Sequence, residues 1–157
     1  MAKISLTQIE VDNILKLHKI IKDNVQWYLD PNYSWAKCEL KVESKLKLDL
    51  KLYLNWNTEV LSLFSFSFIL SHAYRIAGLD FKGSHKNTHM DNNSWKGESH
   101  IHIWTEKCRD TWAFTPEDIN NGNIEEIFRI FCNKYNIEFK GKFYSLPPIQ
   151  ESLFKEI

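Results

Sequence analysis

Four of the chain's six histidines lie in the stretch from His85 to His102. Two of them, His100 and His102, are separated by one residue in the apolar segment SHIHIWT, which is typical of a β-strand. Successive strand side chains point to opposite faces, so the two imidazoles should leave the same face about 7 Å apart. We therefore expect them to line a shared, water-accessible pocket, with Trp104 on their face and Ile101 in the core.

This pair of imidazoles is compatible with three different roles. Because an imidazole has an ordinary pKa of about 6.5, one ring can act as a general base while the other acts as an acid. Such a pair suits RNA cleavage, in which a base takes the 2′-hydroxyl proton and an acid protonates the leaving oxygen. An H-x-H pair with a third histidine could instead hold zinc. In the third role the histidines simply face solvent and pack against Trp104. We favour acid–base chemistry without a metal.

Cationic side chains close to the histidines would stabilise negative charge that develops on a phosphate. Arg75 stands on an apolar segment just before a polar stretch over residues 82–98 that contains Lys82 and Lys86. An arginine can bind a phosphate through two parallel hydrogen bonds, which a lysine cannot do. The polar stretch also contains His85 and is expected to form a functional loop that folds back over the histidine pair.

Alternating apolar and polar residues predict the strands that must position these side chains. Residues 45–56 carry leucine or tryptophan at every second position, and residues 60–71 repeat the pattern with phenylalanine and leucine. Because only a short polar turn separates the two segments, they should form an antiparallel hairpin. Further strands are expected over residues 34–43, 74–81, 99–105 and 112–114.

Two helices are expected to flank this sheet. Apolar residues recur at helical spacing from Leu6 to Ile21, and Thr7 with Glu10 has the spacing of a capping box, so a first helix should end near Asp23.

Residues 124–135 form the second expected helix, and residues 136–157 should add an extended piece and a short terminal helix. These elements predict a single α+β domain over residues 1–157, with an N-terminal helix, an antiparallel sheet of about five to six strands, and a C-terminal helix.

Composition argues against several classes of protein. Lysine and arginine together number 20, as do aspartate and glutamate, so no overall basic field draws the chain to nucleic acid. Cys38, Cys108 and Cys132 are widely spaced and odd in number, which is typical of free thiols in a reducing compartment. The N-terminus lacks an apolar signal region, and the apolar stretch over residues 60–70 is too short to span a bilayer. We therefore expect a cytoplasmic protein with no membrane partner.

The segment from Tyr74 to Ala113 reads YRIAGLDFKGSHKNTHMDNNSWKGESHIHIWTEKCRDTWA. It resembles a set of uncharacterised small bacterial and phage-associated proteins that have an arginine-bearing strand followed by G-x-H-x-N, H-I-H and W-A. It is also distantly similar to the TumE class of toxins from toxin–antitoxin modules, which carry a histidine loop before an H-x-H strand. The resemblance implies functional roles for the residues at matching positions, which are Arg75, Gly83, His85, Asn87, His100, His102 and Trp112.

Together these features predict a toxin-like, RNA-directed protein that acts as a metal-independent ribonuclease without a cofactor. Its expected partners are RNA or a ribonucleoprotein, and a cognate antitoxin. The alternative is a non-enzymatic inhibitor of phage or mobile-element origin that binds a protein of a bacterial defence complex, as anti-CRISPR proteins do. The expected catalytic residues are His85, His100, His102 and Arg75, and the expected substrate-binding residues are Lys82, Lys86, Asn87 and Trp104.

Overall fold

The protein is described by a computed structural model that covers residues 6–81, 84–86, 94–96, 99–109, 113–114 and 122–146, without the side chains of residues 84–86, 94–96 and 114. Two helices and eleven strands occur in these residues. The elements are α1 (Gln8–Lys16), β1 (Lys19–Ile21), β2 (Tyr28–Leu29), β3 (Trp35–Ser44), β4 (Leu50–Asn57), β5 (Phe64–Leu70), β6 (Tyr74–Phe81), β7 (Ser84–Lys86), β8 (Ser94–Lys96), β9 (His100–Ile103), β10 (Ala113–Phe114), α2 (Ile124–Lys134) and β11 (Ile137–Phe139).

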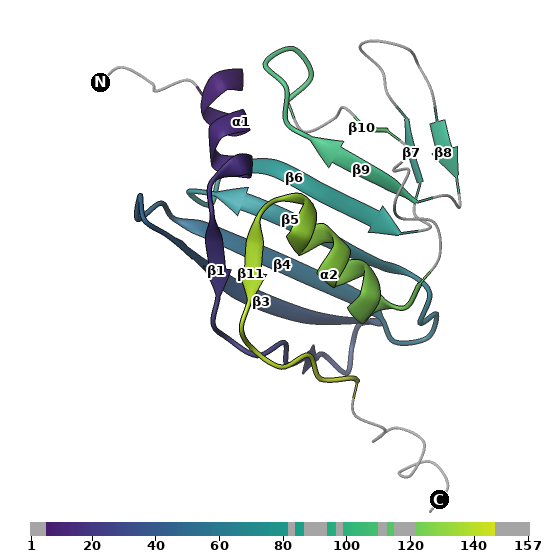
Figure 1. The fold of residues 1–157 in the computed structure, drawn as a ribbon. Coiled ribbons are helices and arrows are strands. Elements are labelled where there is room, and N and C mark those ends of the chain that lie inside the picture. The colour runs from purple at the N-terminus through teal and green to yellow at the C-terminus, as the bar shows by residue number, and fades with distance from the viewer. Residues whose placement is uncertain are drawn as a thin grey trace, which may run out of the picture.

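A curled sheet forms the body of the fold (Figure 1), with the strands in the order β10-β9-β6-β5-β4-β3-β1-β11 and β2 paired to β3. The long strands β3 to β6 pair antiparallel with their neighbours, which confirms the predicted hairpin of β4 and β5. The α+β class is therefore confirmed, but the sheet has more strands than predicted. It is also not wholly antiparallel, because β1 and β11 pair in parallel.

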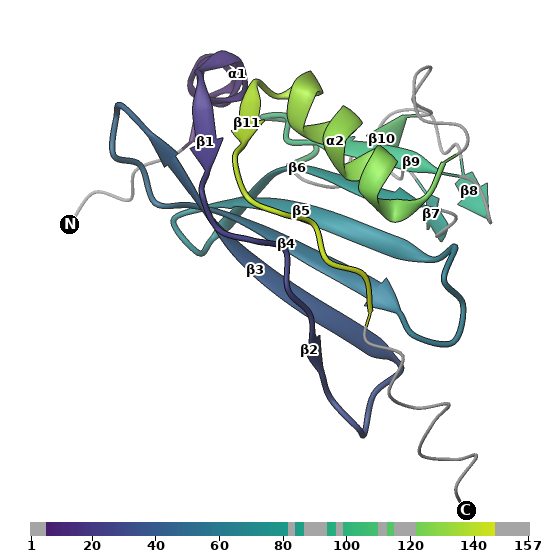
Figure 2. The ribbon, with the colours of Figure 1, turned by 60° about the horizontal axis from the view of Figure 1, so that its bottom comes forward.

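The hydrophobic core lies between one face of the sheet and the two helices. Figure 2 shows α1 and α2 on the same side of the long strands. Phe66 on β5 is fully buried there and meets Phe128 and Phe131 of α2 edge-on, with ring centroids 6.0 and 5.6 Å apart. Apolar residues alternate with polar ones along β4 and β5, so the opposite face of the sheet is polar. No helix of the described residues covers that opposite face, which we call the open face.

The first helix is shorter than its apolar spacing predicts. The capping box of Thr7 and Glu10 is present, but α1 ends at Lys16 and the next apolar residues form β1. β-branched residues such as Ile20 and Ile21 favour an extended backbone, and here both pair with β11 while Ile20 also pairs with β3.

Lys19 joins the end of α1 to this sheet. Its side chain is fully buried, and Nζ donates hydrogen bonds to the carbonyl oxygens of Ile14 and Leu15 at 2.6 and 3.1 Å, and to that of Leu17. The last carbonyls of a helix have no partners within it, so the ammonium group completes the end of α1.

Two further predictions about local structure are wrong. The strand expected from residue 45 starts at Leu50, because residues 45 and 46 form a turn and Lys47 has a left-handed backbone, with φ of 52°. Leu46 is consequently exposed rather than part of the core. The stretch over residues 82–98, expected to be a loop, contains a short antiparallel ribbon in which His85 of β7 pairs with Trp95 of β8.

Candidate functional site

The register of the sheet places one carboxylate beside the two predicted histidines. Strand β6 pairs antiparallel with β9, so that Asp80 lies directly opposite His100 and Gly78 lies opposite His102. Paired residues share a face, and diagonal neighbours on that face are within reach of long side chains. Asp80 therefore faces both histidines, on the open face of the sheet.

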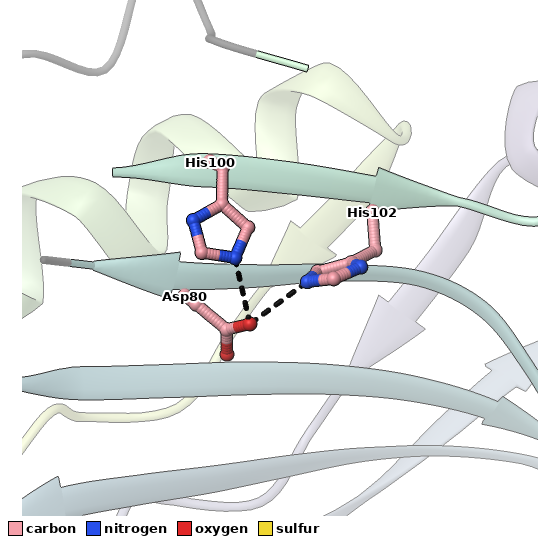
Figure 3. A group of neighbouring side chains, drawn as sticks. All are labelled: Asp80, His100 and His102. Carbon is pink, nitrogen blue, oxygen red and sulfur yellow. Dashed lines mark hydrogen bonds and ion pairs between the residues drawn. The ribbon is translucent and has the colours of Figure 1, made fainter. Parts of the chain in front are cut away.

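The two imidazoles converge on a single oxygen of Asp80 (Figure 3). Nε2 of His100 lies 3.1 Å from Oδ2, and Nε2 of His102 lies 2.8 Å from the same atom. The rings themselves meet edge-on, with centroids 4.9 Å apart. We call Asp80, His100 and His102 the Asp–His–His centre.

The histidines are far less accessible than a water-filled pocket would require. His100 is 0% exposed and His102 is 3% exposed. Asp80, by contrast, keeps 28% of its side chain exposed. Among these three, the carboxylate is thus the group that solvent or a ligand reaches first.

Burial and hydrogen bonding set the charge state of this centre. Burial raises the pKa of Asp80, but the hydrogen bonds from His100 and His102, with the nearby Arg75 guanidinium, outweigh it and hold that pKa well below its ordinary value. Burial lowers the pKa of His102, and Arg75 adds to the effect, whereas Asp80 opposes it. Near neutral pH the carboxylate is therefore ionised and the His102 imidazole is neutral.

Arg75 reaches the centre because of a β-bulge. Ala77 pairs with Phe68 while Arg75 pairs with Ile69, so β6 contains one extra residue, Ile76. In a regular strand Arg75, two residues before Ala77, would fall on the same face as Ala77, which points into the core. The bulge instead turns Arg75 onto the open face, as bulges near functional sites often do.

The guanidinium of Arg75 lies flat in the space left by Gly78. A Cβ at position 78 would lie only 2.5 Å from Nε and 2.7 Å from Cζ of Arg75. From there Nη2 approaches Oδ1 of Asp80 at 3.9 Å. The buried Nε has no hydrogen-bond partner among the described residues.

A groove runs along the open face towards this centre. It has a volume of about 690 Å³, and Lys37, Tyr53 and Ser67 are among the side chains that line it. The sheet register connects the two features, since Tyr53 pairs with Ser67, and Ser67 pairs with Gly78 beside Arg75.

The structure brings together three of the predicted site residues and leaves the others apart or undescribed. Arg75, His100 and His102 meet at one place. Trp104 follows the end of β9, is buried in the hydrophobic core, and has the Arg109 guanidinium 5.5 Å from its ring. His85 and Lys86 have described backbones in β7 but no described side chains, and Lys82 and Asn87 lie outside the described residues.

Asp80 is the site residue that sequence reasoning missed. It interrupts the otherwise apolar end of β6, between the buried Leu79 and Phe81. Strand alternation alone indicates that it faces away from the core, on the polar face of the sheet. The alternation of strand residues could therefore have identified Asp80 as a site residue.

The same three side chains could hold a metal ion. The ligand atoms of Asp80, His100 and His102 all lie within 4.8 Å of one another. Two imidazole nitrogens and a carboxylate oxygen are a donor set that zinc and related transition metals bind.

Comparison with known proteins gives one match. Searches of curated proteins and of solved structures each returned no significant match. No helix of the described residues is both long and apolar enough to cross a bilayer. A family model described as a family of unknown function, DUF6978, matches residues 6–137. This match agrees with the expected resemblance to uncharacterised proteins, whereas the similarity to TumE-type toxins stays a prediction. The chain belongs to this family of unknown function.

Proposed function

We propose that this protein is a toxin-like, RNA-directed ribonuclease whose reactive centre consists of Asp80, His100 and His102, with Arg75 as the phosphate contact. The observation that carries the proposal is the convergence of two imidazoles on one carboxylate oxygen beside a guanidinium. Each of these groups has a defined use in phosphodiester cleavage.

The proposed reaction is attack by the ribose 2′-oxygen on the adjacent phosphorus. A P–O2′ bond forms and the P–O5′ bond breaks, leaving a cyclic phosphate and a 5′-hydroxyl. The centre takes the proton from the 2′-hydroxyl and returns one to the 5′-oxygen. Asp80 orients the imidazoles and stabilises the positive charge that an imidazole gains when it accepts a proton.

Arg75 is suited to the phosphate because of its position and its donors. Its side chain is 20% exposed, and its guanidinium lies beside the carboxylate and has a buried Nε without a partner among the described residues. A guanidinium can donate to two phosphate oxygens at once and so stabilise the charge of the transition state.

The groove on the open face supports RNA as the substrate. Lys37 supplies positive charge there and Tyr53 supplies an aromatic ring, while Glu39, which also lines the groove, is paired with Lys51 at 2.6 Å. Basic and aromatic side chains in one groove are the combination that binds a single-stranded nucleic acid, by contact with phosphates and by stacking on bases.

The test is cleavage of a mixed-sequence single-stranded RNA by the purified chain. We expect His102→Gln to lose at least about 100-fold in rate, a typical contribution of a general acid or base. His18→Gln is the control, because His18 is exposed and lies between α1 and β1, away from the centre and the groove; His72, which pairs with Asp49 at 2.9 Å, lines the groove itself.

Equal rates for the wild type and His102→Gln would refute the proposal. A wild-type chain that cuts no RNA but forms a stable complex with a bacterial defence protein would instead support the non-enzymatic alternative.

A further inference from the structure

We infer that Asp80, His100 and His102 bind a divalent transition-metal ion of the zinc class, which occupies the point where their ligand atoms converge. This inference names the cofactor of the centre proposed above, and its catalytic consequence rests on that proposed function. The binding of the ion itself does not.

Two of the three distances between the ligand atoms are already close to those around one ion. Each bond to zinc is about 2.0 Å long, so two ligand atoms of a tetrahedral ion lie about 3.3 Å apart. In the structure, Nε2 of His100 and Nε2 of His102 lie 3.1 and 2.8 Å from Oδ2 of Asp80. All three ligand atoms lie within 4.8 Å of one another, so small rotations of the side chains would place them around one metal ion.

The side chains that carry these atoms are held in place by the fold. All three come from the paired strands β6 and β9, which hold them at fixed positions on one face. His100 and His102 are almost fully buried, so their rings have little freedom to turn away. A preorganised ligand set of this kind loses little conformational entropy when the ion binds.

Arg75 determines which oxygen of Asp80 is offered to the ion. Its Nη2 lies 3.9 Å from Oδ1, whereas both imidazoles face Oδ2. Asp80 would therefore bind through Oδ2, while Oδ1 stays in an ion pair with the guanidinium. Outer partners of this kind orient the carboxylate ligand of a metal site.

The donor types select the class of ion. Imidazole nitrogens favour zinc, copper, nickel and iron, whereas magnesium and calcium prefer oxygen ligands throughout. The ion would leave at least one position for water when only these three side chains bind it. In the metal-bound centre that water, ionised to hydroxide, would take the 2′-hydroxyl proton in place of a bare imidazole, and the water so formed could return a proton to the 5′-oxygen.

The experiment treats the full chain with a chelator and then titrates it with Zn(II), monitored by calorimetry, and separately with Co(II), monitored by the visible absorption of the cobalt. We expect one ion per chain and an intense cobalt spectrum that reports nitrogen and oxygen ligands in four- or five-coordination. Asp80→Asn and His102→Gln should each weaken binding by at least about 100-fold. Asp49→Asn should bind as the wild type does, since it removes the carboxylate of the exposed His72 pair.

Two results would overturn the inference. One is that the wild type shows no saturable binding of the ion. The other is that Asp80→Asn, shown by circular dichroism to be folded, binds the ion as tightly as the wild type does. The metal site and the ribonuclease activity can be refuted independently of each other. RNA cleavage that persists in the chelated, metal-free chain would refute the metal's role while leaving the ribonuclease. Tight binding of one ion without RNA cleavage would refute the ribonuclease while leaving the metal site.

Discussion

Gly78 tests the position of Arg75 without touching any ionisable group. In Gly78→Ala, the new Cβ would lie 2.5 Å from Nε of Arg75, whereas ordinary contact starts at 3.4 Å, so Nε must retreat by about 0.9 Å. The guanidinium is the end of a flexible side chain and can move, so the backbone need not. We therefore expect this variant to fold normally and to lose the placement of Arg75 beside Asp80.

The expected stability change is small because two small effects oppose each other. Alanine is favoured over glycine in a strand by about 0.5–1 kcal/mol, and the partly exposed Arg75–Asp80 pair contributes about 0–1 kcal/mol. Thermal unfolding should therefore stay within a few degrees of the wild type. Gly141→Ala is the control, because its Cβ would collide with the backbone carbonyl of Asp23. That variant should lose about 1–3 kcal/mol of stability.

The expected loss of activity is much larger. Removing a hydrogen-bonded contact to a charged group costs about 1.5–3 kcal/mol, which corresponds to about 10- to 100-fold in the rate of RNA cleavage. The assay compares single-turnover cleavage by the wild type, Gly78→Ala and Arg75→Ala at equal concentration. The reasoning is refuted if Gly78→Ala cleaves at the wild-type rate, or if it unfolds as readily as Gly141→Ala.

Three further predictions concern buried groups outside the centre. Burial lowers the pKa of Lys19 from 10.5 to about 8, so the folded state releases this proton more readily than the unfolded state does. The contribution of Lys19 to the free energy of unfolding should therefore rise by about 3 kcal/mol between pH 8 and 10.5. Denaturant unfolding at several pH values should show this rise, and Lys19→Met should lack it. Burial raises the pKa of Cys38 to about 11 and of Cys132 to about 12, so iodoacetamide should label these thiols only after unfolding, and rapid labelling of the native chain would contradict their burial. Phe131→Ala should cost about 3–5 kcal/mol of unfolding free energy, because it opens a cavity beside Phe66.

The strands that carry the site could be predicted because their signals are local. Alternating leucines in β4 and phenylalanines in β5 define one buried face each, and the H-x-H spacing puts both histidines on one face of β9. The capping box before α1 is equally local, and it was predicted correctly.

What could not be predicted depends on pairing between distant segments. Ile20 and Ile21 match a helical pattern, and only the pairing of β1 with the distant strands β3 and β11 makes them a strand. The partner of His100 is Asp80 because of the register between β6 and β9, and a shift of one residue would turn Asp80 to the other face.

Two features of the centre itself also required the tertiary structure. The bulge at Ile76, which turns Arg75 to the open face, breaks the alternation of β6, but the alternation alone does not say that Ile76 is the extra residue. Histidine side chains on the polar face of a strand are expected to be exposed to solvent. The near-complete burial of His100 and His102 follows only from how the chain packs around them.

Asp80→Asn is the most direct test of the reactive centre, because the amide keeps the shape of the carboxylate but not its charge. We predict that this variant still folds, unfolds at a lower temperature because the two imidazoles lose their ionised partner, and loses at least about 100-fold in the rate of RNA cleavage. Asp49→Asn should keep both the melting temperature and the cleavage rate of the wild type. A folded Asp80→Asn chain that cleaves RNA as fast as the wild type would contradict the account.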